Sequence, residues 1–163
     1  MRPWALSMIM IAVSALPAGA RDMLVHDQQE YAAAAKLLAP GDRIVLANGE
    51  WRDFAVRFSA TGQADKPITL TAETPGKVIL TGRSSLRMAG NWLVVSDLVF
   101  RDGHGGDEEL IAFRDGAKRW AENSRLTGVV VDGYGPPDAA RTDHWVSLYG
   151  RNNRVDHSHF AGK

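Results

Sequence analysis

The sequence predicts an all-β fold, a parallel β-helix with a short N-terminal capping helix. The main observation is a repeat, because the stretch from 145 to 160 matches one that begins sixty residues earlier. The matched positions are Leu86 with Val146, Met88 with Leu148, Gly90 with Gly150, Val95 with Val155, and Phe100 with Phe160. A third copy places Leu126 and Val131 between them, so the pattern recurs after 31 residues and again after 29. Such a period is typical of a stacked repeat, and short β-rich segments broken by Gly, Asn and Asp favour strands as its unit.

Apolar positions that repeat in this way stack on one another inside a solenoid. We therefore expect six equivalent side chains to lie in one buried column. They are Val95, Phe100, Leu126, Val131, Val155 and Phe160.

Residues 1–20 have the pattern of a secretory signal peptide. Arg2 is their only charge, the segment from Trp4 to Leu16 is apolar, and small residues at 18–20 suit a cleavage site. The apolar segment is too short to span a bilayer; a buried N-terminal helix is the alternative. The sequence therefore predicts a leader over 1–20 and a secreted or periplasmic chain over 21–163 that forms the N-terminal turns of one β-helix domain.

Composition limits the classes of partner. The chain has 19 basic and 19 acidic residues and no cysteine, so packing rather than disulfide bonds must stabilise an exported domain. Balanced charge gives no indication of a nucleic-acid partner or an anionic membrane surface, and no segment is apolar for long enough to span a membrane. An anionic substrate would require a local basic groove.

One helix is expected between residues 24 and 42, from Gln28 to Leu38. Asp27 and Glu30 form a capping-box pattern, and Pro40-Gly41 ends the helix. Its apolar face would consist of Tyr31, Ala34, Ala35 and Leu38. Since the end of a β-helix exposes apolar side chains and unpaired strand edges, this helix is in the right place to cover the N-terminal end.

Strands are expected at both sides of short turns after Asp42, and longer polar loops later in the chain. The early strands are 44–46, 54–58, 68–71 and 78–80, with a turn at 48–49 and a surface loop at 61–67. The later loops are 101–109, 114–123 and 132–143. Long loops on a solenoid usually form its binding face.

Two stretches resemble a known family. They are WVSLYGRNNRVDHSHFAGK, at 145–163, and DKPITLTAETPGKVILTG, at 65–82. Both are similar to polysaccharide lyase family 6, which contains alginate lyases and the dermatan-cleaving chondroitinase B, and the resemblance extends over residues 24–163. It implies a right-handed, pectin lyase-like solenoid and an anionic polysaccharide as substrate. The sequence of the segment WVSLYG, at 145–150, is more similar to the alginate lyases than to the dermatan-cleaving enzyme.

The resemblance also implies a reaction, the β-elimination of a 1,4-linked uronic acid polymer. Calcium or an arginine neutralises the uronate carboxylate, a lysine of lowered pKa removes the C5 proton, and an acid protonates the leaving oxygen. In the family these roles belong to a Lys–Arg pair and to calcium held by an Asn and two Glu, all after the position that matches Lys163. We therefore expect no catalytic or metal-binding residue in this chain, calcium in the full-length family member, and an incomplete, inactive N-terminal fragment.

Four residues are candidates for substrate binding. Lys118 and Arg119 stand beside Trp120, and two cations next to an aromatic ring suit a sugar acid. Arg141 and His144 follow the Gly135–Asp138 segment, which could form a rigid loop along a groove. An ordinary surface turn is the alternative for both segments.

Two further clusters have structural explanations. His157 and His159 are expected on one face of a strand, with Asp156 on the other, and hydrogen bonding between turns is favoured over metal binding. The segment 103–109 resembles a glycine-rich calcium turn, but it occurs once, which favours a solvated loop.

Two other functional classes remain open from sequence. One is a non-catalytic carbohydrate-binding or adhesive β-helix, which would use the same loops without a base. The other is a purely structural solenoid.

Overall fold

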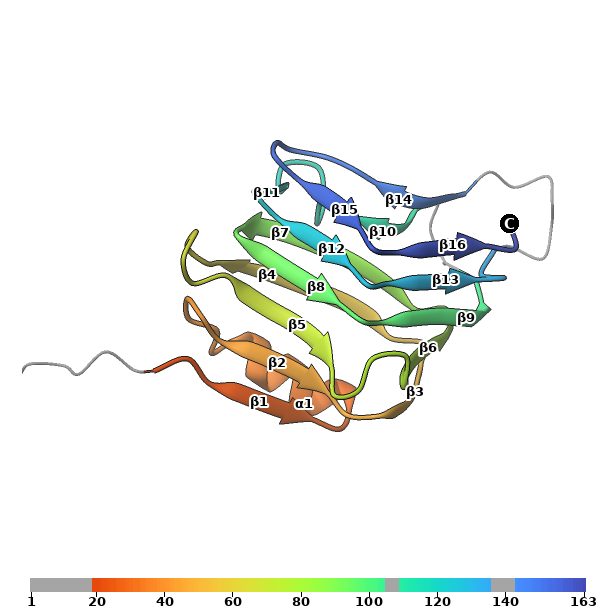
Figure 1. Cartoon of the computed structure of the whole chain (residues 1–163), viewed down its shortest axis with the longest axis horizontal. Coiled ribbons are helices and arrows are strands. Elements are labelled where there is room, and N and C mark those ends of the chain that lie inside the picture. Colours follow the sequence, from red (N-terminus) through yellow and green to blue (C-terminus); the bar gives the residue numbers. More distant parts are fainter. Residues whose placement is uncertain (1–18, 105–108, 136–142) are drawn as a thin grey trace, which may run out of the picture.

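The chain winds into a coil of three parallel sheets, with one helix at its N-terminal end (Figure 1). The structure is a computed structural model and describes residues 19–104, 109–135 and 143–163. Each complete turn of the coil contributes strands to all three sheets, and every pairing between the named strands is parallel. This confirms the β-solenoid that the repeat predicted.

The three sheets are named here A, B and C. Sheet A has the order β1 (Asp22–Val25), β2 (Arg43–Leu46), β5 (Ile68–Ala72), β8 (Leu93–Ser96), β12 (Arg125–Thr127) and β15 (Arg154–Asp156). Sheet B contains β3 (Gly49–Arg52), β6 (Val78–Gly82), β9 (Val99–Gly103), β13 (Val130–Asp132) and β16 (His159–Ala161). Sheet C contains β4 (Ala55–Thr61), β7 (Ser85–Asn91), β10 (Glu109–Ala112), β11 (Ala121–Glu122) and β14 (His144–Ser147).

The predicted repeat positions stack in register, but in two columns rather than one. In sheet A, Leu126 pairs with Val95 on one side and Val155 on the other. In sheet B, Val131 likewise pairs with Phe100 and Phe160. The prediction of a single column was wrong because the 97–98, 128–129 and 157–158 corners turn the chain between the two residues of each copy. Both columns face the same apolar interior.

The sixty-residue match in sheet C skips one turn of the coil. Ile111 lies between Leu86 and Val146 and pairs with both. The match of Met88 with Leu148 continues this register, because Ala112 pairs with both Arg87 and Ser147, but Met88 is buried whereas Leu148 lies beyond the end of β14 and is exposed. The loops before and after β10 differ in length, so Ile111 is not spaced regularly from Leu86 and Val146 in the sequence. For this reason the repeat did not identify Ile111.

Single residues in the left-handed conformation turn the corner from sheet C to sheet A. Trp92, Asn123 and Asn152 occupy this position, with φ of 53°, 50° and 57°. Asparagine tolerates this conformation better than most residues. Its amide also links the turns, because Asn123 Nδ2 donates to Asn91 Oδ1 at 2.9 Å and Asn152 Nδ2 donates to Asn123 Oδ1 at 3.0 Å. The expected hydrogen bonding of polar side chains between turns is confirmed at this corner.

The repeated glycines mark close contacts between turns. A Cβ atom on Gly90 would lie 1.8 Å from the Ala60 carbonyl oxygen, and one on Gly150 would lie 2.2 Å from that of Ala121. No side chain fits at such distances. The match of Gly90 with Gly150 therefore reflects a steric requirement of stacking.

The helix α1 (Gln28–Ala35) covers the β1 and β2 end of the coil, as predicted (Figure 1). The Asp27 side chain accepts from the Glu30 amide at 2.8 Å, while the Glu30 carboxylate accepts from the His26 amide. Tyr31 is buried and packs edge-on against Phe54 at 5.0 Å between ring centroids. The helix ends three residues earlier than predicted.

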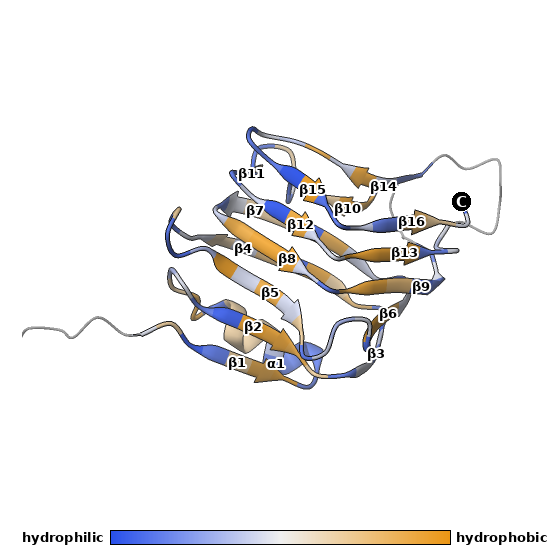
Figure 2. Cartoon of the chain, viewed as in Figure 1, coloured by the Kyte–Doolittle hydropathy of each residue, from blue (hydrophilic) through white to orange (hydrophobic). Residues whose placement is uncertain are grey.

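The buried carboxylate of Asp42 fixes the segment between α1 and β2 by hydrogen bonds. Asp42 is 2% exposed and accepts from the Ala39 amide and from the Arg21 backbone and side chain. The Arg21 hydrogen bonds hold the pKa of Asp42 below its usual value despite burial. Neither this contact nor the strands β1, β3 and β11 were predicted from the sequence. Figure 2 shows that β1, β2, β12 and β15 of sheet A each begin with a hydrophilic residue.

The signal peptide remains a prediction. Residues 1–18, which carry its charge and apolar segment, lie outside the described residues. In the part of the chain that the structure describes, no helix combines the length and apolarity needed to cross a membrane.

The two phenylalanines of the sheet B column provide a matched test of packing. Phe100 is fully buried, whereas Phe160 is 36% exposed and stacks on Trp145 at 6.3 Å. Phe100→Ala is expected to lower the free energy of unfolding by about 3 to 5 kcal/mol and Phe160→Ala by about 1 kcal/mol, because only the first leaves an enclosed cavity. Urea unfolding of both variants measures the difference; equal losses would contradict this packing.

Candidate functional site

A loop between β10 and β11 lies over the outer face of sheet C and is held there by a buried carboxylate. Asp115 is 5% exposed and accepts from Arg57 Nη1 at 2.8 Å and from Arg119 Nη2 at 2.7 Å. Backbone hydrogen bonds close the loop, with the Asp115 amide donating to the Arg119 carbonyl and the Ala121 amide to the Phe113 carbonyl. The loop is therefore a fixed wall.

The first hollow lies between this wall and the ends of β4 and β7. It has a volume of about 470 Å³, within the usual range of ligand sites. Its floor comes from strand residues paired in register, 59–61 with 89–91. Its wall carries Lys118, Arg119 and Trp120, and Glu122 completes the lining.

A second hollow, of about 420 Å³, lies on the other side of Trp120. Its lining consists of Trp120, Glu122, Tyr149, Gly150 and Arg151. Arg151 donates to the Glu122 carboxylate at 3.3 and 3.4 Å. Both hollows therefore share Trp120 and Glu122. Their lining residues include three cations and one carboxylate, and the two hollows together are named here the basic groove.

The wall of the second hollow is also fixed in place. Tyr149 donates its phenol hydrogen to Glu109 Oε1 at 2.6 Å, and Arg114 lies over the Tyr149 ring, 4.2 Å from its centroid. Arg114 also donates to Glu109 Oε2 at 3.0 Å. Burial tends to raise the pKa of Glu109, but hydrogen bonds from Tyr149, Arg114 and Ser147 more than offset it and hold that pKa below its usual value.

The structure brings together two of the four predicted substrate-binding residues. Lys118 and Arg119 line the first hollow. His144 is exposed at the start of β14, where it pairs with Glu109, and it lines neither hollow. Arg141 lies outside the described residues, as do four residues of the 103–109 loop, at 105–108.

The second half of the groove was not predicted from the sequence. Tyr149 and Arg151 belong to the stretch that carried the repeat, and their side chains were assigned no role. The repeat itself contained the signal, because Gly150 lies one turn above Ala121 and so places its neighbours beside Trp120.

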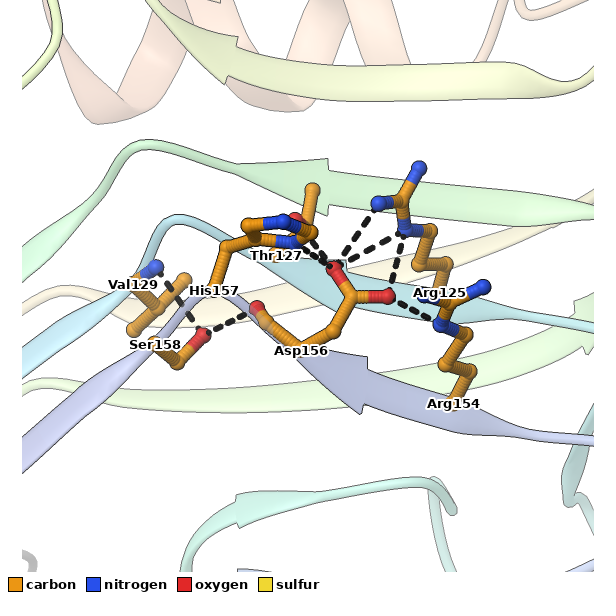
Figure 3. A network of polar contacts seen from close by, with 7 residues as sticks. All are labelled: Arg125, Thr127, Val129, Arg154, Asp156, His157 and Ser158. Carbon is orange, nitrogen blue, oxygen red and sulfur yellow. Dashed lines mark hydrogen bonds and ion pairs between the residues drawn. The ribbon is translucent and has the colours of Figure 1, made fainter.

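The cluster around Asp156 supports the corner between sheets A and B rather than a ligand site (Figure 3). The Asp156 carboxylate accepts from Arg125 at 2.8 and 3.0 Å and from Thr127 at 2.6 Å, forms an ion pair with Arg154, and contacts His157 Nδ1 at 2.9 Å. Hydrogen bonds from Arg125, His157 and Thr127, in that order, hold its pKa far below the usual value.

The predicted placement of Asp156 opposite the two histidines was wrong. β15 ends at Asp156, and His157 turns the corner with φ of 49°, so the two side chains meet. His159 begins β16 and belongs to another sheet. The hydrogen bonds of Asp156 and Ser158 to the preceding turn support the structural interpretation of this segment.

Among residues 19–104, 109–135 and 143–163, no three His, Cys, Asp or Glu side chains come together in a way that could hold a metal ion. No step of a reaction is therefore assigned to calcium on these residues.

Comparisons with known proteins agree on the class of protein. The family model for chondroitinase B matches residues 25–163. The alginate lyase AlyGC of polysaccharide lyase family 6 is 51% identical, with a TM-score of 0.85, over 86% of this chain and 19% of that protein. A mannuronic acid-specific lyase of the same family from human gut microbiota is 30% identical, with a TM-score of 0.77, over 88% and 34%.

A lyase of this family from Pseudopedobacter saltans is 27% identical, with a TM-score of 0.68, over 85% of this chain and 34% of that protein. A search of curated proteins found no match. The chain thus spans a fifth to a third of the length of these solved structures.

The parallel coil, with long loops on one sheet, has the architecture of a β-solenoid. The matches then specify the family. This chain belongs to the chondroitinase B family of polysaccharide lyases, polysaccharide lyase family 6.

The charge of Glu109 should contribute to stability in a pH-dependent way. A carboxyl whose folded pKa is lowered stabilises the protein above its unfolded pKa of about 4.3, and the contribution is lost as pH falls through the folded pKa. Glu109→Gln is expected to cost about 1 kcal/mol at pH 7, with the difference from the unaltered chain narrowing below about pH 4.

Urea unfolding at pH 7, 5 and 3.5 measures this change. Asp65→Asn, in an exposed loop, is the control and should change little at any of these values. A Glu109→Gln deficit that stayed constant across the series would show that the carboxylate charge has no part in it.

Proposed function

We propose that this chain forms the turns that carry the substrate groove of a secreted polysaccharide lyase. The enzyme cleaves uronic-acid polymers by β-elimination and prefers alginate to dermatan sulfate. The observation that carries the proposal is the basic groove on the outer face of sheet C, where Lys118, Arg119 and Arg151 outnumber Glu122. Its support comes from the 51% identity to an alginate lyase.

The groove would bind and orient the polymer. Uronate carboxylates are attracted to the cations, and arginine in particular matches a planar carboxylate with paired N–H donors. The reaction additionally needs a base at C5 and an acid at the leaving oxygen. We assign neither role to a residue of this chain. In this proposal the catalytic pair and the calcium ligands lie in parts of the family fold that these residues do not match.

Two further parts of the proposal rest on sequence. The leader pattern of residues 1–20 supports export to the periplasm or beyond. The family resemblance supports calcium as the cofactor of the complete enzyme.

The proposal can be tested with the chain and with a chimera. The purified chain should release no unsaturated uronate from alginate or dermatan sulfate, with or without calcium. Replacing the matching turns of AlyGC with residues 25–163 should give a chimera that cleaves alginate with calcium present, because the two segments are similar in sequence and shape.

Two outcomes would overturn the proposal. Turnover by the chain alone that disappears in Lys118→Ala, Arg119→Ala or His144→Ala would place the catalytic site in these loops. A folded chimera that binds alginate without cleaving it would favour the non-catalytic binding protein.

A further inference from the structure

The two hollows of the groove meet at one aromatic side chain. Trp120 lines both of them and is 49% exposed, which is unusual for so large an apolar surface beside a charged groove. Its backbone position is fixed, since it forms a bridge with Arg114 across the base of the loop. An indole held in this way offers a flat face on which the C–H face of a sugar ring can pack.

Each hollow contains a cation suited to one carboxylate. Lys118 lines the first and makes no ion pair with any residue in the described part of the chain. Arg151 lines the second; its side chain is 75% exposed and its contacts with Glu122 are long, at 3.3 and 3.4 Å. Arg119, by contrast, is engaged by Asp115 at 2.7 Å. Lys118 and Arg151 are therefore the two cations most available to a ligand.

The groups behind the hollows favour a preformed site. Asp115 fixes the loop that carries Lys118, and Glu109 fixes the Tyr149 ring beside Arg151. Side chains that are already ordered lose little conformational entropy when a ligand binds. The shared Glu122 carboxylate would accept hydrogen bonds from sugar hydroxyls and repel a carboxylate placed over it, which would direct the acidic groups outward to Lys118 and Arg151.

We propose that the two hollows are consecutive sugar subsites for a 1,4-linked oligouronate. The sugar in each hollow contacts Trp120, and its carboxylate binds Lys118 in the first hollow and Arg151 in the second. This inference rests on the proposed function for the class of polymer, and it adds the residues that bind two successive sugars. Trp120, Lys118 and Arg151 are binding residues in it, with no part in proton transfer.

Calorimetric titration of the purified chain with a mannuronate tetramer tests the inference. Lys118→Ala and Arg151→Ala should each weaken binding at least tenfold, because each removes a hydrogen bond to a charged group. Trp120→Ala should weaken binding about tenfold, because it removes the aromatic face on which the sugar packs. Trp120→Phe keeps an aromatic face and should lose less than Trp120→Ala. Lys77→Ala, on the exposed turn between β5 and β6, is the charge-matched control and should bind as the unaltered chain does.

A neutral mannose tetramer and a salt series complete the experiment. The neutral tetramer should bind more weakly than the uronate, and Lys118→Ala should not weaken it further. Salt should weaken uronate binding, with a smaller effect in Lys118→Ala and Arg151→Ala, because each variant removes one screened ion pair.

The outcomes separate this inference from the proposed function. An active AlyGC chimera whose tetramer affinity is unchanged by Trp120→Ala, Lys118→Ala and Arg151→Ala would overturn the subsites and leave the lyase proposal standing. Equal affinity for the neutral and acidic tetramers would overturn the assignment of the two cations to carboxylates. An inactive chimera with the predicted affinity losses would overturn the lyase proposal alone.

Discussion

Parallel pairing between successive turns is the constraint on which the rest of this structure depends. Interior strands obtain their backbone hydrogen bonds from the turns on either side, and strands at the ends of the coil from one neighbouring turn, so equivalent residues must lie directly above one another. Left-handed residues at the corners make this possible, and at the corner from sheet C to sheet A they are Trp92, Asn123 and Asn152. Their φ values, within a few degrees of one another, give each turn the same corner, and the asparagine amides connect the turns.

The groove is a consequence of the same register. Gly150 can lie over the Ala121 carbonyl only because it has no side chain, and this close approach brings Tyr149 and Arg151 beside Trp120. The β10–β11 loop then needs a fixed position on sheet C, which Asp115 provides through two arginines. A carboxylate that is 5% exposed is stable there because both of its oxygens are paired with cations. Packing and charge pairing thus jointly shape the binding face.

The sequence predicted what the repeat encodes directly. The stacking of Leu126 and of Val131 with their repeat partners follows from spacing, although in two columns rather than one, and the capping helix follows from residue type. The assignment of Lys118 and Arg119 to substrate binding stays a prediction. Prediction from the sequence failed where the structure depends on residues far apart in the chain or on the backbone conformation at a corner. Ile111 was missed because flanking loops of different length remove the period, and the contact of Asp156 with His157 was missed because the corner conformation breaks strand alternation. The second hollow requires residues thirty positions apart to meet, which only the stacking register shows.

Cysteine cross-linking tests the register most directly, and the chain has no native cysteine to interfere. Val130 pairs with His159 across β13 and β16, and both side chains point away from the core. Neighbouring strands lie about 4.8 Å apart, so Val130→Cys with His159→Cys should be joined rapidly by a short bifunctional thiol reagent. Val130→Cys with Phe160→Cys should react far more slowly, because adjacent residues of a strand point to opposite faces. Efficient cross-linking of the second pair, or failure of the first in a folded protein, would contradict the stacked register.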